Sequence, residues 1–116
     1  MINSKDKGKK FELTVAHLFK DYGFADAHRT AQFCGNTGQA GDVEGVPHLH
    51  IECKAQERMQ LYDWIDQAKR DASHNGKIPV VIHKKNNSEV LVTMRFEDFM
   101  KLYMEYEQNE IINTEI

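Results

Sequence analysis

Apolar side chains recur at helical spacing in three stretches of the chain. Residues 11–22 and 61–72 each carry apolar positions at intervals of three and four, which predicts two amphipathic helices. A third helix is predicted over residues 96–106 from the positions Phe96, Phe99, Met100, Tyr103 and Tyr106. We expect the aromatic stripe of this third helix, and Trp64 of the second, to pack in the core.

Strand patterns occupy the intervals between these helices. Apolar and polar residues alternate over 48–54, which is the period of a strand. Residues 78–82 form a continuous apolar run that predicts a strand buried on both faces, and residues 90–94 predict the next strand. Weaker patterns predict a strand within 25–34 and a short one at 42–44.

The predicted order is α-β-β-β-α-β-β-α, which indicates an α/β fold with a mixed central sheet flanked by helices. A length of 116 residues favours one domain. We divide the chain into a basic N-terminal arm (1–10), a single domain (7–107) and a frayed acidic tail (108–116).

Composition is ordinary for a globular protein, with 41% hydrophobic and 28% charged residues. There is no apolar run near the ~20 residues of a membrane span, and the N-terminus lacks the apolar segment of a signal peptide. We therefore expect no membrane association and a cytoplasmic location. Cys34 and Cys53 are then expected to be reduced thiols, and without a CxxC pair they argue against a zinc site.

Charge is unevenly distributed along the chain. The net charge is −3, but residues 96–116 contain six acids and one base, which leaves 14 bases and 12 acids in the remainder. The chain before residue 96 is thus mildly basic and compatible with DNA binding. The candidates for contacts to the DNA backbone are Lys5, Lys7, Lys9 and Lys10, although the same lysines would also make a solubilising arm.

The strongest chemical signal is formed by Asp42, Glu52 and Lys54. Glu52 and Lys54 are two apart on the predicted strand and so share one of its faces. Carboxylates are suited to magnesium or manganese, and the backbone carbonyl of Cys53 offers a third oxygen. Lys54 could orient or deprotonate a water, or stabilise charge developing on a phosphate. The pattern favours metal-dependent phosphodiester hydrolysis.

Four further side chains could complete such a site. Glu12, from the first helix, could hold a water on the metal or a second ion, and Gln67 could complete the polar rim. His48 and His50 could contact a phosphate or a leaving group. Plainer explanations stay open, because Glu-x-Lys on an exposed strand is commonly a surface ion pair and the other residues could be solvated surface groups.

Several short motifs together resemble the PDDEXK nuclease superfamily, especially its small phage and prokaryotic members similar to Holliday junction resolvases. The matching stretches are Lys7-Gly8-Lys9-Lys10-Phe11-Glu12, Gly41-Asp42-Val43 and His50-Ile51-Glu52-Cys53-Lys54. The resemblance covers residues 5–106 and implies a restriction-endonuclease-like core with its site on a hairpin. Gly41 stands where a proline is common.

This resemblance implies a Mg²⁺-dependent endodeoxyribonuclease, with Mn²⁺ as a substitute, that leaves 5′-phosphate and 3′-hydroxyl ends. It gives Glu12 the role of the acidic residue of the first helix. Asp42 and Glu52 become metal ligands, Lys54 the catalytic lysine, and Gln67 a looser match on the second helix. The implied partners are branched DNA and a second copy of the chain, in a bacterial or phage-infected cell. Candidates for the dimer face are Leu61, Tyr62, Trp64 and the C-terminal aromatic helix.

Three other functions stay open at this point. The chain could be a PDDEXK nuclease acting on flaps, ends or a restriction site, a DNA-binding or assembly module that kept the fold without catalysis, or an ordinary α/β interaction domain. Clustered carboxylates argue against an inactive module, because they repel one another without a metal.

Overall fold

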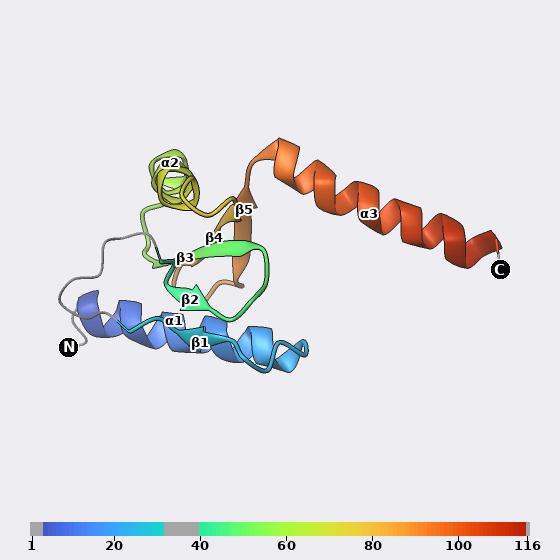
Figure 1. The fold of residues 1–116 in the computed structure, drawn as a ribbon. Coiled ribbons are helices and arrows are strands. Elements are labelled where there is room, and N and C mark those ends of the chain that lie inside the picture. Colours follow the sequence, from blue (N-terminus) through green and yellow to red (C-terminus); the bar gives the residue numbers. More distant parts are fainter. Residues whose placement is uncertain (1–3, 32–39, 116) are drawn as a thin grey trace.

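The computed structural model describes residues 4–31 and 40–115, which form a five-stranded sheet and three helices (Figure 1). In chain order the elements are α1 (Ser4–Asp21), β1 (His28–Arg29), β2 (Val43–Glu44), β3 (Leu49–Ala55), α2 (Leu61–Ala72), β4 (Ile78–Lys84), β5 (Leu91–Met94) and α3 (Phe96–Glu115). The predicted α/β order is confirmed.

The sheet is mixed, and its strands lie side by side in chain order. β1 pairs antiparallel with β2, and β2 antiparallel with β3. β3 and β4 are parallel, joined through α2, and β5 returns antiparallel to β4. The long strands β3 and β4 thus form the centre, and the short strands β1 and β2 lie on the β3 side of the sheet.

Helices α1 and α2 cover opposite faces of this sheet (Figure 1). Ile51 and Cys53 of β3 pack into the cluster under α1, because side chains two apart share a face. Val81 of β4 faces the other way and packs against Trp64 and Ala68 of α2. The expectations that β4 is buried on both faces and that Trp64 belongs to the core are confirmed.

The N-terminal part of the chain differs from the sequence analysis in two respects. The strand expected within residues 25–34 is reduced to His28–Arg29, and residues 32–39 lie outside the described part of the chain. The basic arm expected over residues 1–10 is helical from Ser4 onward, so its four lysines lie within the first two turns of α1. Because these lysines belong to a helix, the directions of their side chains from the backbone are fixed, whereas a flexible arm would leave them variable.

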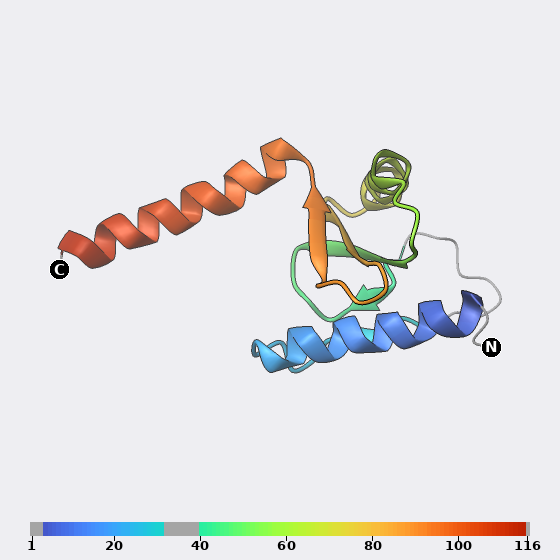
Figure 2. The ribbon, with the colours of Figure 1, turned by 180° about the vertical axis from the view of Figure 1, so that it is seen from behind.

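The C-terminal helix departs furthest from expectation. α3 continues to Glu115 instead of fraying after residue 107, and it projects away from the sheet (Figures 1 and 2). Its aromatic stripe was expected in the core, and that prediction is wrong, because Phe96, Phe99, Tyr103 and Tyr106 are exposed. Periodicity identifies an apolar face of a helix, but not what covers it. Within the described ranges, no helix combines the length and the apolar character needed to cross a membrane.

Candidate active site

Asp42 is fixed to the central strand by backbone and side-chain hydrogen bonds. Its own N–H donates to the carbonyl oxygen of Ile51 at 2.7 Å, and its carbonyl accepts from Thr30 N–H at 2.9 Å. The carboxylate oxygen Oδ2 accepts a hydrogen bond from the backbone N–H of Cys53 at 2.8 Å. The Asp42 side chain therefore lies against the strand that carries Glu52 and Lys54.

Gly41 makes this close approach possible. A Cβ atom at position 41 would lie 2.6 Å from the carbonyl oxygen of Ile51 and 2.9 Å from its nitrogen, both backbone atoms with no freedom to retreat. Only glycine avoids this clash at the observed spacing. A glycine at position 41 thus has a local steric reason in this chain.

Glu52 is buried and held by a histidine on the same strand. Glu52 and His50 are 6% and 2% exposed, and His50 Nε2 lies 2.9 Å from Glu52 Oε1. Asp71 of α2 completes a group of three possible metal-ligating side chains, whose ligand atoms lie within 4.8 Å of one another. This burial does not support the predicted contact between His50 and DNA, because the imidazole is shielded from solvent and turned toward Glu52.

The electrostatics of Asp42 suit a cation site. The pKa of Asp42 is raised to about 7, chiefly by burial and also by the charges of Glu52 and Glu12, against the lowering effect of the Cys53 N–H. A divalent cation would relieve this repulsion, and carboxylate oxygens are the donors that hard cations prefer. The residues present therefore fit a divalent metal ion. Burial also raises the pKa of the Cys53 thiol, so Cys53 would stay a neutral thiol, as expected for a reduced cysteine.

Glu12 reaches the same neighbourhood from α1, where Arg29 of β1 holds it. Arg29 Nε donates to Glu12 Oε1 at 2.7 Å, and both side chains are largely buried. Arg29 was not among the residues predicted from the sequence. Its 17-residue separation from Glu12 and its position in a weakly patterned strand gave no signal for the pair.

The remaining predicted site residues are dispersed around this centre. Lys54 is half-buried on the same face of β3 as Glu52, and it joins none of the ion pairs found within residues 4–31 and 40–115. Gln67 is exposed on α2, one turn before Asp71 and on the same side of that helix. His48 is exposed just before β3, in a left-handed conformation with φ 71°.

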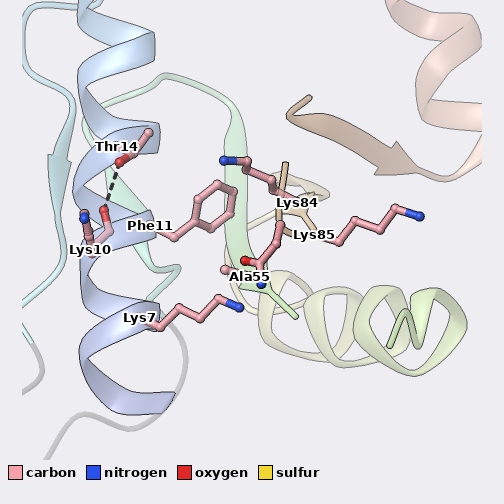
Figure 3. Close-up of a pocket in the computed structure, with 8 residues that line it drawn as sticks. Lys7, Lys10, Phe11, Thr14, Ala55, Lys84 and Lys85 are labelled. Carbon is pink, nitrogen blue, oxygen red and sulfur yellow. Dashed lines mark hydrogen bonds between the residues drawn. The ribbon is translucent and has the colours of Figure 1, made fainter. Parts of the chain in front are cut away.

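A basic pocket lies beside the C-terminal end of β3 (Figure 3). Its volume is about 430 Å³, and it is lined by Lys7, Lys10, Phe11, Thr14, Ala55, Lys84, Lys85 and Asn86. Two of the four lysines predicted to contact DNA, Lys7 and Lys10, thus share a concave surface, whereas Lys5 and Lys9 are exposed on α1 and do not line it.

Lys84 and Lys85 are basic residues of this pocket that the sequence analysis missed. The parallel register pairs Ala55 with Lys84, so the strand end after Lys54 lies next to these two lysines. Knowing that β3 and β4 pair in parallel would have indicated that Lys84 and Lys85 lie near Lys54. The sequence did not specify this pairing.

Residues 3–116 match the family described as "Phage putative PDDEXK endonuclease". Among curated proteins, no significant match was found. A solved structure of Hjc, a Holliday junction resolvase from the archaeal hyperthermophile Archaeoglobus fulgidus, matches with a TM-score of 0.57 and 22% identity, over 75% of this chain and 76% of that one. The structural match shows a shared fold, and the family match spans nearly the whole chain. The chain therefore belongs to the phage PDDEXK endonuclease family.

Proposed function

We propose that this protein is a Mg²⁺-dependent endodeoxyribonuclease that cleaves four-way DNA junctions. The observation that carries the nuclease assignment is the Asp42 carboxylate, held against β3 by the Cys53 N–H, with its pKa raised by burial and by Glu52. Membership of an endonuclease family supports the reaction class, and the likeness to a Holliday junction resolvase supports the junction as substrate.

The proposed metal ligands are Asp42, Glu52 and the backbone carbonyl of Cys53, with Mn²⁺ as a substitute for Mg²⁺. When bound, the ion would polarise the scissile phosphate and make hydroxide available near neutral pH. His50 would fix the orientation of the Glu52 carboxylate through the 2.9 Å contact between His50 Nε2 and Glu52 Oε1. Glu12, which Arg29 orients, would hold a water at the edge of the site.

Lys54 is proposed to act on the reacting groups directly. Its amine would orient or deprotonate the attacking water, or stabilise the charge that develops on the phosphate. It lies on the face of β3 that carries Glu52, and the described ion pairs leave it free for this role. Gln67 would contribute to the polar rim from α2, a looser assignment because its side chain is exposed.

The basic pocket and the exposed residues around it would make most of the contacts to DNA. Lys7 and Lys10 would contact backbone phosphates within the pocket, and Lys5, Lys9 and His48 would make peripheral contacts. Resolving a junction requires two opposed strands to be cut, which a symmetric homodimer would accomplish with two equivalent sites. We therefore include a homodimer in the proposed function.

Cleavage of labelled DNAs with Mg²⁺ tests this function. The panel contains a four-way junction, a flap, a plain duplex and a single strand, with the Glu52→Gln variant as control. Paired symmetric nicks in the junction alone, absent in the variant, are expected. Glu52-dependent cleavage of the other DNAs would keep the nuclease and reject the junction as its substrate. Binding without Glu52-dependent cleavage, with Mg²⁺ or Mn²⁺, would reject the enzyme in favour of an inactive DNA-binding module.

A further inference from the structure

Helix α3 carries an apolar surface that the rest of the described chain leaves uncovered. The helix makes no substantial contact with another helix or strand among the described residues, and it extends away from the body (Figure 2). Four rings form a ladder along it, with centroids 6.5 Å apart for Phe96 and Phe99, 6.0 Å for Phe99 and Tyr103, and 6.4 Å for Tyr103 and Tyr106. Most of the stability of a helix in a protein comes from tertiary packing of its apolar face, so the exposed ladder indicates a surface that a partner would cover.

Local contacts around the buried Asp98 hold the first turn of α3. Asp98 is fully buried, and its carboxylate accepts a hydrogen bond from Arg95 Nε at 2.7 Å and lies 3.5 Å from Lys101 Nζ. The Asp98 N–H also bonds the carbonyl of Arg95 at 3.1 Å. These contacts join Arg95, the residue between β5 and α3, to the first turn of α3. Helix α3 with its aromatic ladder extends away from the chain's own sheet (Figure 2).

The ladder continues at its base into an apolar groove on the body. The groove has a volume of about 360 Å³ and is lined by Leu61, Tyr62, Ile65, Thr93, Met94, Arg95 and Phe96. Phe96 belongs both to the groove and to the ladder, and it is 77% exposed. Tyr62, on the α2 side of the groove, is 87% exposed. One continuous apolar surface thus runs from α2 along the inner half of α3.

Charge divides this surface into two complementary parts. Beside the groove lies a second pocket with the cationic side chains of Lys69, Lys77 and Arg95. The outer half of α3 carries the acidic residues Glu105, Glu107 and Glu110, with no lysine or arginine after Lys101. A parallel helix pair would place the acidic outer halves of both helices side by side. An antiparallel pair would instead place each acidic outer half near the second pocket of the other copy, where Lys69 joins none of the ion pairs found within the described residues.

We propose that α3 pairs antiparallel with the α3 of a second copy of this chain, so that the outer half of each helix covers the groove of the other. Such a contact is self-complementary about a two-fold axis, as a symmetric dimer requires. Twenty residues give α3 a length of about 30 Å, enough for two helices to overlap along their ladders. The proposal specifies the interface of the homodimer included in the proposed function. Its test needs neither DNA nor metal, so failure of either proposal is separately visible.

The test is sedimentation velocity of the full chain over a range of micromolar concentrations, without DNA or metal. The expected species has twice the chain mass of 13.4 kDa. Tyr103→Glu places a charge in the centre of the ladder and is expected to weaken dimerisation by about 30-fold or more. Gln108→Glu is the matched control, because it adds the same charge about 140° further around the helix at ~100° per residue. This control should leave the dimer intact.

A variant on the body examines the groove separately. Tyr62→Glu is expected to weaken dimerisation comparably, and since Tyr62 is almost fully exposed the substitution should not disturb folding, which circular dichroism checks. A dimer that survives Tyr62→Glu would overturn the proposed docking of the helix in the groove. A chain that stays monomeric at every concentration, or a dimer equally stable in Tyr103→Glu, would overturn the pairing of the helices.

Discussion

The backbone N–H of Cys53 donates a hydrogen bond to Asp42 Oδ2 at 2.8 Å, and this one contact joins the two halves of the candidate site. Asp42 lies 11 residues earlier in the chain, immediately before the two-residue strand β2. The bond holds its carboxylate beside β3, where Glu52 raises the pKa of Asp42. Without a cation, burial and the neighbouring carboxylates destabilise the ionised form of Asp42.

We expect the metal-free protein to lose stability as pH rises from about 4 to about 7. The pKa of Asp42 is about 7 in the folded state, whereas the ordinary value expected in the unfolded state is 3.8. Between these pH values the folded state therefore keeps a proton that the unfolded state has released. This contribution is complete below pH 4, declines up to pH 7 and changes no further above it. Urea unfolding in EDTA, as the difference between wild type and Asp42→Asn at each pH, measures it. Parallel curves for the two proteins would contradict the prediction.

Arg29 should act through Glu12. Because Arg29 Nε holds Glu12 at 2.7 Å, Arg29→Gln frees that carboxylate, and we expect cleavage to slow by about 10–100-fold, as for other outer partners of a metal site. Glu12→Gln and the double variant complete a cycle. The two losses should be strongly non-additive if they act through one contact. Additive losses would separate Arg29 from Glu12 and would indicate a direct role in DNA binding.

His50 should set the apparent metal affinity. His50→Ala removes the partner of the buried Glu52 Oε1, and we expect about 10–100-fold more Mg²⁺ to be needed for half-maximal cleavage. The maximal rate at saturating metal should fall much less. Asp71→Asn is a useful comparison, since Asp71 is near the same pair. An unchanged Mg²⁺ concentration for half-maximal cleavage in His50→Ala would show that Glu52 binds the metal equally well without the His50 contact.

The basic pocket should contribute to DNA affinity through phosphate contacts. We expect Lys84→Ala and Lys85→Ala each to weaken binding uniformly across DNA sequences and to lower the salt dependence by about one phosphate contact. Lys20→Ala is the matched control, because Lys20 is exposed on α1 and does not line this pocket. Fluorescence anisotropy with DNA at several salt concentrations gives both quantities. An equal effect of Lys20→Ala would point to net charge instead of the pocket.

The order of elements and the strand carrying Glu52 and Lys54 could be predicted from the sequence, because helical and strand periodicities are local properties of consecutive residues. The same is true of the buried strand β4 and of the second helix with Trp64 in the core. These elements also supplied the motif that relates the chain to PDDEXK nucleases. The assignment of the site residues to roles in catalysis stays a prediction.

Only the tertiary structure decided which distant side chains meet. The Glu12–Arg29 pair, the position of Asp71 beside His50 and the lysines that join Lys7 and Lys10 in one pocket all depend on pairing between elements far apart in sequence. The same limit explains α3. Its aromatic spacing predicted an apolar face correctly, but whether this face packs on the sheet or on another molecule depends on the direction in which α3 leaves the sheet. Spacing along a chain determines which residues share a face, whereas the packing of whole elements determines what that face meets.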